Sequence, residues 1–381
     1  MNGRLLVPIF YAVLGYRMPR VASSPNQINL LSLTEDGLAS LVKDLNWPAY
    51  RSIQILRWLY QRRVRSVDEM TNLSVEDRKR LAARAVIGRP DHCRILRASD
   101  GTAKLLVALN DGLTVETVLI PDDERLTLCV STQVGCTLDC NFCLTGTMGL
   151  RRNLKAYEIV EQVLTAQDHL RKDERITNLV FMGMGEPLAN VNELSDAVRR
   201  LTNKTWGLTW SARRITVSTA GLASRMRDIA PLGVNLAISL NATTEAQRDS
   251  LMPGAQRISS LKALLAACRR YPLPPGRRLT FEYVLLAGVN DQENDARRLA
   301  QLLRGMTCKV NLIPFNEFQS SPYRRPSDVS VLAFQSIIRR AGIDAFIRKS
   351  RGREVLGACG QLGTLPASVA EGALTQIESH C

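Results

Sequence analysis

The sequence predicts an α/β protein: a partial (β/α)6 barrel preceded by a small helical accessory domain and a short antiparallel β extension. Three observations predict this fold. Apolar, β-branched runs alternate with helical stretches from residue 126 onward, residues 35–85 show helical spacing alone, and residues 93–121 alternate with period two. The 381 residues suffice for a barrel-sized core plus an accessory domain.

Residues 1–34 form a leader segment that has two explanations. Residues 1–21 are apolar and lack acidic side chains, as in a signal or transit peptide, but Pro8 interrupts them and no clean cleavage site follows. A translation start at Met18 explains the segment equally well. No apolar stretch reaches the ~20 residues needed to cross a bilayer, so we expect no membrane association.

Residues 35–90 are predicted to form the helical domain. Residues 34–45 indicate one helix capped by Thr34, and residues 49–63 indicate a second. The whole chain carries a formal charge of +14, and residues 51–90 hold ten basic side chains against four acidic ones. A solvated helix face is the ordinary explanation of such charge; contact with nucleic-acid phosphates is the functional alternative.

Residues 91–125 are predicted to form a small antiparallel sheet that bridges the helical domain and the barrel. Three alternating runs, 93–96, 103–109 and 113–120, are separated by Asp-Gly turns. Glu116 lies in the third run among strong β-formers. Its alternation with Val115 and Thr117 favours an exposed side chain.

Residues 126–350 are predicted to form the barrel. The predicted strands span residues 126–131, 178–184, 214–219, 235–240, 279–286 and 308–314. The predicted helices span residues 156–170, 191–201, 222–229, 261–270, 291–303 and 328–340. Six such units imply a parallel sheet, whose active-site residues lie on loops at the carboxyl ends of the strands.

The loop after the first barrel strand holds Cys136, Cys140 and Cys143 at spacing C-x3-C-x2-C. Soft thiolates bind iron–sulfur clusters, zinc or copper(I), but a closed zinc site takes four ligands and no histidine lies nearby. On a four-iron cluster, three cysteines leave one iron open to S-adenosylmethionine (SAM), whose reductive cleavage yields a 5′-deoxyadenosyl radical. A zinc knuckle or scattered buried thiols are the alternatives.

Polar groups follow several other barrel strands. After the second strand, glycines such as Gly185 would let a ligand approach the backbone, and the carboxylate of Glu186 could bind its amine. Each later group alone is more often a cap or turn residue, but their shared location suits hydrogen bonds to SAM. These later groups are Ser218, Ser239, Asn241 and Asn316.

Residues 351–381 are predicted to form a C-terminal loop and tail. Cys359 has glycine-rich flanks, which favour a mobile loop over a core position. Four basic residues between positions 348 and 353 would suit a phosphate backbone. The cysteines expected to be merely structural are Cys93, Cys268, Cys308 and Cys381.

Six short motifs together resemble one known family. They are VETV at 115–118, LCVS at 128–131, GMGEP at 183–187, NLIPFN at 311–316, RKSRG at 348–352 and ACGQL at 358–362. Over residues 35–363 the chain resembles the RlmN/Cfr family of radical-SAM RNA methyltransferases, and most of all its RlmN members.

The resemblance implies radical methylation of adenine carbon 2, which has no lone pair to attack a methyl sulfonium. One SAM methylates Cys359, and the radical from a second SAM takes a hydrogen atom from that methyl group. The resulting carbon radical adds to the adenine. Glu116 then accepts the proton of carbon 2, while Cys129 attacks the sulfur and leaves a Cys129–Cys359 disulfide.

The resemblance also assigns SAM contacts, and one of them departs from the family pattern. The family often has histidine where Asn241 stands, although asparagine also donates and accepts hydrogen bonds. The implied contacts are Gly185, Glu186, Ser218, Ser239, Leu240, Asn241 and Asn316.

The implied substrates are an adenosine in the peptidyl-transferase centre of 23S rRNA and the adenosine 3′ to the anticodon of tRNAs. The implied partner is a one-electron reductant such as flavodoxin or ferredoxin, and the expected state is a cytoplasmic monomer. Nine cysteines, an odd number and tightly clustered, suit a reducing compartment. Two alternatives stay open: methylation of carbon 8, as in Cfr-like relatives, and a non-catalytic iron–sulfur RNA-binding sensor.

Overall fold

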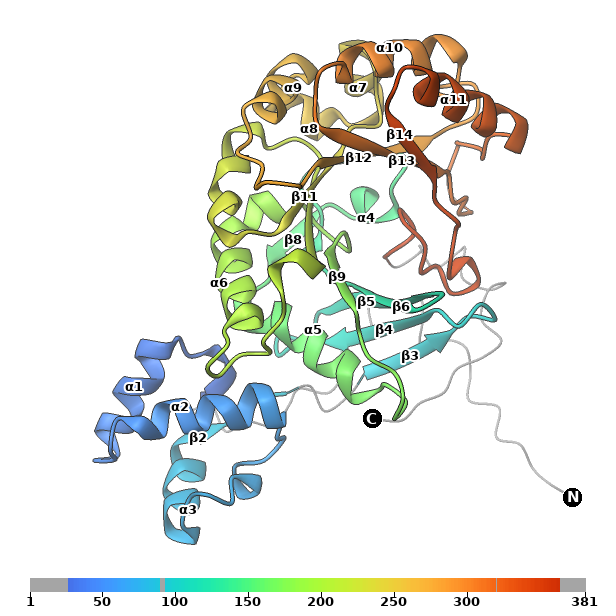
Figure 1. Ribbon diagram of the computed structural model, residues 1–381. Coiled ribbons are helices and arrows are strands. Elements are labelled where there is room, and N and C mark those ends of the chain that lie inside the picture. The colour runs from blue at the N-terminus through green and yellow to red at the C-terminus, as the bar shows by residue number, and fades with distance from the viewer. Residues whose placement is uncertain (1–26, 90–92, 320, 364–381) are drawn as a thin grey trace, which may run out of the picture.

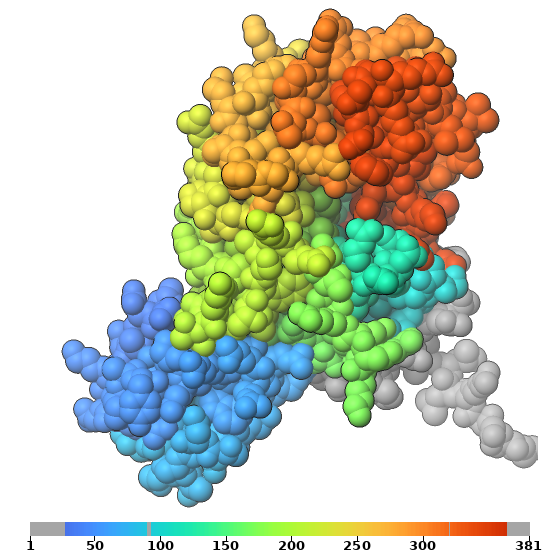
Figure 2. Space-filling model, in the orientation of Figure 1, coloured from blue at the N-terminus to red at the C-terminus, as the bar shows by residue number. Residues whose placement is uncertain are grey.

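The computed structural model describes residues 27–89, 93–319 and 321–363, which form a small helical lobe and a larger α/β body (Figure 1). Most of the predicted leader, the tail beyond residue 363 and Cys381 lie outside the described residues. None of the helices in these ranges is long and apolar enough to cross a bilayer. Figure 2 shows the lobe projecting from one side of the body.

A two-stranded parallel ribbon joins the two ends of the helical lobe: β1 (Ile28–Asn29) pairs with β2 (Ala85–Val86). The predicted cap is confirmed, because Thr34 Oγ1 accepts a hydrogen bond of 3.1 Å from the Gly37 amide. The predicted helix at 49–63 is confirmed as an α-helix continued by a π-helical turn. The lobe contains η2 (Leu30–Ser32), α1 (Glu35–Asp44), α2 (Tyr50–Arg57), η3 (Trp58–Arg62), η4 (Val67–Glu69) and α3 (Val75–Arg84).

The lobe is fastened to the body by a buried arginine of helix α6 (Val191–Thr202). Arg200 donates to the Leu31 carbonyl (2.7 Å) and to the Tyr60 hydroxyl (2.9 Å). Its charge is balanced by Asp196, whose carboxylate accepts two further hydrogen bonds of 3.1 and 2.9 Å. The Tyr60 ring also packs on Trp206, with centroids 5.1 Å apart.

One ten-stranded sheet runs through the α/β body. Its strands are β3 (Cys93–Arg97), β4 (Ala103–Ala108), β5 (Thr114–Asp122), β6 (Arg125–Cys129), β9 (Asn178–Phe181), β10 (Ile215–Thr219), β11 (Asn235–Ser239), β12 (Leu279–Leu285), β13 (Cys308–Pro314) and β14 (Asp344–Ile347). Their spatial order is β14-β13-β12-β11-β10-β9-β6-β5-β4-β3. Within this sheet, the strands from β6 across to β14 all pair parallel, so the predicted barrel strands are confirmed, with β14 added.

The β extension is not a separate sheet. β3, β4 and β5 pair antiparallel, as predicted, but β5 also pairs antiparallel with β6 and so continues the barrel sheet. The register places Cys129 of β6 opposite Val118 of β5. The extension therefore lines the same site as the barrel.

Helices cover the outer face of the curved sheet (Figure 1). The predicted helix at 222–229 is a 3-10 helix that contains Pro231, which has no amide proton to donate. Helices α7 and α8 were not predicted. The remaining helical elements are α5 (Ala156–Asp168), η5 (Pro187–Asn190), η6 (Ala212–Arg214), η7 (Ala223–Leu232), α7 (Glu245–Leu251), α8 (Pro253–Ile258), α9 (Leu261–Arg269), α10 (Glu293–Leu303), α11 (Asp328–Arg340) and η8 (Arg353–Val355).

Candidate active site

The cysteine loop is closed at its base by a small hairpin. β7 (Gln133–Gly135) follows β6 and pairs antiparallel with β8 (Leu150–Asn153), and the short helix α4 (Leu144–Thr147) lies between them. Cys136, Cys140 and Cys143 all lie within this enclosed loop, partly buried and without disulfides. A Cβ at Gly146 would stand 2.6 Å from the Cys140 carbonyl, so the tight loop requires glycine there.

The three thiols lie close enough to influence one another electrostatically. Loss of solvent, together with a thiolate at Cys143, raises the pKa of Cys136 to about 12. Burial likewise raises the pKa of Cys140, together with the charges of the other two thiolates. A metal bound by these cysteines would therefore have to displace the thiol protons.

The donor set fits an iron–sulfur cluster. In a four-iron cluster each thiolate binds a different iron, so three cysteines leave one iron without a protein ligand. Three free thiols on one loop match that chemistry.

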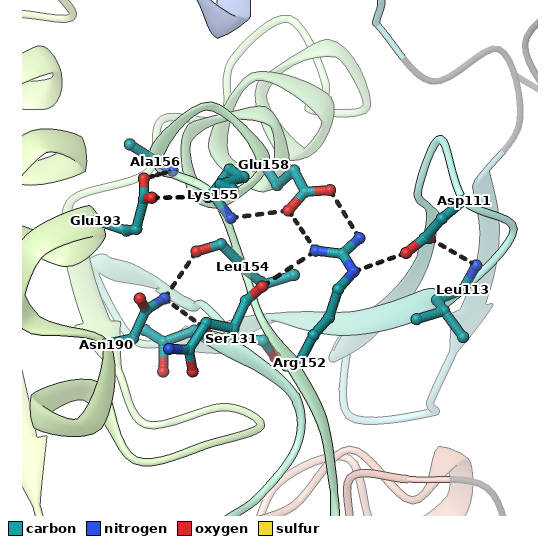
Figure 3. A network of polar contacts seen from close by, with 12 residues as sticks. Asp111, Leu113, Ser131, Arg152, Leu154, Lys155, Ala156, Glu158, Asn190 and Glu193 are labelled. Atoms are coloured by element: carbon teal, nitrogen blue, oxygen red, sulfur yellow. Dashed lines mark hydrogen bonds and ion pairs between the residues drawn. The ribbon is translucent and has the colours of Figure 1, made fainter.

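A polar network holds the strand that ends the cysteine loop (Figure 3). Arg152 of β8 pairs with Glu158 of α5 at 2.7 Å and with Asp111 at 2.6 Å. Asn190 donates to the carbonyls of Thr132 (2.9 Å) and Leu154 (2.7 Å), on either side of the hairpin. The loop is therefore anchored at both of its ends.

The glycine-rich loop after β9 packs directly on the strand that leads into the cysteine loop. Gly185 has φ +101°, and a Cβ there would lie 2.5 Å from Gln133 Cβ. The Glu186 amide donates to Gln133 Oε1 (2.9 Å), while its carboxylate accepts from the amides of Leu188 (3.0 Å) and Ala220 (2.7 Å). Burial raises the pKa of Glu186. Its charge also acts on Cys136 and Cys140, so the carboxylate lies beside the cysteine loop.

The other predicted SAM contacts lie at the carboxyl ends of β10 to β13. Ser218 and Ser239 are hydrogen-bonded through their hydroxyls at 3.2 Å, and buried Leu240 follows Ser239. The Asn316 amide donates to the Cys359 carbonyl (3.1 Å), but its buried Oδ1 has no partner among the described residues. An unpaired buried acceptor is unfavourable, so it suits a ligand donor.

Asn241 differs from these residues because protein groups already bind its carboxamide. It has φ +55°, and its Oδ1 accepts from the Val284 amide at 2.8 Å. Its Nδ2 donates to Met252 Sδ at 3.5 Å. The side chain therefore shapes the loop after β11 in this structure.

The C-terminal loop lies across the site and is seated on the helix that follows the last cysteine. The Leu144 amide donates to the Gly360 carbonyl (2.7 Å), and Thr145 Oγ1 donates to the Leu362 carbonyl (2.5 Å). Cys359, directly before Gly360, is exposed. Protein atoms around its thiol, and then the Glu282 carboxylate, raise the pKa of Cys359.

Glu116 is buried, and the prediction of an exposed side chain is wrong. Only 6% of its surface is accessible, because the C-terminal loop covers the face of β5 that would otherwise meet solvent. Its carboxylate pairs with Lys104 (3.4 Å) and accepts from the Gly363 amide (3.0 Å). Burial raises the pKa of Glu116, although the Lys104 cation opposes the rise.

Cys129 lies at the end of β6, between β5, the strand that carries Glu116, and β9. Its carbonyl accepts from Thr117 Oγ1 at 2.6 Å. Burial raises the pKa of Cys129, and a thiolate at Cys359 raises it further, so the two thiols are neighbours. The structure thus brings Cys129, Cys359 and Glu116 together at the same site as the cysteine loop.

Two charged residues at this site were missed by sequence reasoning. Lys104 contacts both Glu116 and, at 3.4 Å, the Leu356 carbonyl of the C-terminal loop. A lysine inside the otherwise apolar run of β4 was the available signal. Arg248 is fully buried beside Cys140, and its position in a polar helix gave no such signal.

Two family models match the chain. The Radical SAM superfamily model matches residues 130–300, the part that carries the cysteine loop and most barrel strands. The model named ribosomal RNA large subunit methyltransferase N-terminal domain matches residues 28–87, which form the helical lobe.

Curated relatives match nearly the whole chain. A dual-specificity RNA methyltransferase RlmN from Desulfotalea psychrophila is 45% identical over 355 residues, which cover 90% of this chain and 97% of the relative. One of the same name from Solidesulfovibrio magneticus is 47% identical over 338 residues, or 88% and 96% of the two chains.

A solved structure agrees with the fold described above. The radical SAM methyltransferase from Sphaerobacter thermophilus superposes with a TM-score of 0.84 at 43% identity, covering 89% of this chain and all of that one. The resemblance predicted from the motifs is confirmed. The chain therefore belongs to the RlmN family and is a radical SAM RNA methyltransferase.

Proposed function

We propose that this enzyme methylates carbon 2 of one adenosine in the peptidyl-transferase centre of 23S rRNA and of the adenosine 3′ to the anticodon in tRNAs. Two SAM molecules would be used per turnover, with a methyl-cysteine intermediate and a transient disulfide. The observation that carries the proposal is the meeting of Glu116, Cys129 and Cys359 beside the cysteine loop. A simple iron–sulfur sensor of RNA would need none of these three groups.

Cys136, Cys140 and Cys143 would hold one [4Fe-4S] cluster, and Glu186 with the unpaired Asn316 Oδ1 would bind SAM beside it. The contacts with Gly185, Ser218, Ser239, Leu240 and Asn241 are proposed on the family pattern. When both are bound, the cluster and SAM together supply a 5′-deoxyadenosyl radical.

The chain's own residues would divide the remaining chemistry. Cys359 carries the methyl group, and its exposure leaves it open to both SAM and a nucleobase. Glu116 accepts the proton from carbon 2, a role its buried position suits because a raised pKa makes a carboxylate a better base. The adduct must also give back the one electron that began the reaction. Cys129 then attacks the Cys359 sulfur, and the carbon–sulfur bond breaks with its electron pair on carbon. That carbon takes up a proton to become the methyl group of the released RNA, and a Cys129–Cys359 disulfide remains.

Basic side chains away from the proposed active site support RNA as the substrate. A cavity of about 1490 Å³ lies between the helical lobe and the amino ends of β9 and β10. Phosphates would neutralise this surface while the target base is extruded into the barrel. Its basic lining residues are Arg63, Arg65, Arg171, Lys172, Arg175 and Arg214, against the acidic Glu69, Asp168 and Glu174. We further propose a cytoplasmic monomer reduced by a flavodoxin or ferredoxin.

Mass spectrometry of RNA nucleosides tests the proposed product. RNA from cells with the gene should contain 2-methyladenosine in 23S rRNA and tRNA, and RNA from cells without it should lack that nucleoside. 8-Methyladenosine in its place would indicate the Cfr-like reaction. Identical nucleosides in both strains would contradict a methyltransferase acting at these sites.

Lys104→Met is expected to shift the acidic limb of the methylation pH profile to higher pH. The Lys104 cation holds down the pKa of buried Glu116, so its removal raises that pKa and leaves less carboxylate at a given pH. The rate on the acidic limb should fall severalfold and recover at higher pH. Lys155→Met, which removes a half-exposed surface ion pair with Glu193, should leave the profile unchanged. An unshifted limb in the Lys104 variant would refute this role.

A further inference from the structure

Arg248 of α7 is a buried charge without a carboxylate partner. Its side chain has 0% exposure, and it donates to the Ala220 carbonyl (2.6 Å) and, at 3.5 Å, to the Leu240 carbonyl. Its Nε has no hydrogen-bond partner, and within the described ranges no carboxylate lies within ion-pairing distance. The guanidinium is thus held by main-chain carbonyls alone, apart from a weak 4.0 Å contact with Met252 Sδ.

Such a charge is unfavourable unless something balances it. Removing an ion from water costs several kcal/mol, which a partner of opposite charge normally offsets. The two other buried arginines of the described residues, Arg89 and Arg200, follow that rule through Asp168 and Asp196. Arg248 therefore calls for a negative group that the chain's carboxylates do not supply.

Negative charge can reach Arg248 from the cysteine loop as well as from two carboxylates. Burial lowers the pKa of Arg248, and the opposing influence that ranks first is a thiolate at Cys140, ahead of Glu245, Glu186 and Cys268. Both carboxylates are already engaged by backbone amides: Glu186 as described above, and Glu245 by Leu261 at 2.9 Å. Burial raises the pKa of Cys268 to about 12, so that thiol stays neutral. Cys140, as a thiolate bound to iron, is the group left to balance the charge of Arg248.

The helix that carries Arg248 is fastened to the cysteine loop. The Asn141 amide donates to the Leu251 carbonyl (3.0 Å), and Asn141 Nδ2 donates to the Ser250 carbonyl (2.6 Å). In the next helix, a Cβ at Gly254 would lie 2.4 Å from the Leu138 carbonyl, so the two backbones are in direct contact. The guanidinium is therefore fixed in place relative to Cys140.

We propose that Arg248 is the buried counter-ion of the iron–sulfur cluster and that its positive charge makes the cluster easier to reduce. The inference rests on the cluster of the proposed function. Three thiolates outweigh the charge of an oxidised [4Fe-4S]²⁺ core, and reduction adds another negative charge. A fixed cation in a medium of low dielectric constant stabilises the reduced form more than the oxidised one. Arg248 is thus a positioning and tuning residue that touches no substrate.

The test is a redox titration of the anaerobically reconstituted full chain, followed by electron paramagnetic resonance. At the wild-type midpoint, Arg248→Gln should lower the ratio of reduced to oxidised cluster at least tenfold, equivalent to about 59 mV for one electron. Arg248→Lys keeps the charge and should recover most of that loss. Arg200→Gln, which removes an equally buried arginine at the lobe interface, should keep the wild-type midpoint.

Each outcome decides the inference. Equal midpoints in iron-loaded wild type and Arg248→Gln would overturn it, as would equal displacement in the glutamine and lysine variants, since shape and not charge would then matter. A cluster lost from Arg248→Gln and retained in Arg248→Lys would support it. A wild-type chain that binds no iron would instead overturn the proposed function itself, together with this inference.

Discussion

Cys129→Ala is expected to trap the protein covalently on its RNA. Without the thiol, the crosslink between Cys359 and the adenine has no internal nucleophile to resolve it, although every earlier step is intact. The substitution leaves the Thr117 contact in place, because that bond uses the Cys129 carbonyl. Free methylated RNA should fall at least a hundredfold, about 2.7 kcal/mol of added barrier.

The adduct is measured with labelled RNA on denaturing gels and located by mass spectrometry of the nuclease-trimmed peptide. Cys129→Ala combined with Cys359→Ala should give no adduct. Cys268→Ala, which alters a buried cysteine on α9, should behave as wild type. Recovery of only free RNA and free protein from Cys129→Ala would count against the resolving role of Cys129.

Cys359→Ala is expected to abolish RNA methylation while SAM cleavage continues. The cysteine loop and the strand ends proposed to bind SAM are untouched, so 5′-deoxyadenosine should still form under reducing conditions. The local fold should persist, since the Asn316 side chain binds the Cys359 carbonyl and not its thiol. Methylated nucleoside should drop at least a thousandfold, about 4 kcal/mol.

Both products can be quantified in the same reaction by liquid chromatography and mass spectrometry. Cys308→Ala, a half-buried cysteine at the start of β13, is the matched control and should keep both activities. Methylation that persists in Cys359→Ala would exclude a route through a methylated cysteine.

The barrel and its cysteine loop could be predicted because local patterns determine them. β-Branched runs followed by helical spacing indicate parallel strands, and three cysteines after the first strand indicate the loop. The Thr34 cap also depends on neighbouring residues alone. These features need no knowledge of distant contacts.

The environment of Glu116 could not be predicted, since it depends on residues far along the chain. Alternation in β5 implies one solvent face, but Gly363 and its loop cover that face. The partners of Lys104 and the continuity of β5 with β6 likewise depend on tertiary pairing. Periodicity reports which side chains share a face, but not what later packs upon it.

Metal content is the most direct measurement of the central claim, that three cysteines hold a cluster with one open iron. Purified without oxygen and reconstituted, the wild-type chain should be brown and contain about four iron atoms. Cys140→Ala should lose most of that iron, while Cys268→Ala should retain it. A wild-type chain that stays colourless and free of iron would contradict the entire mechanism.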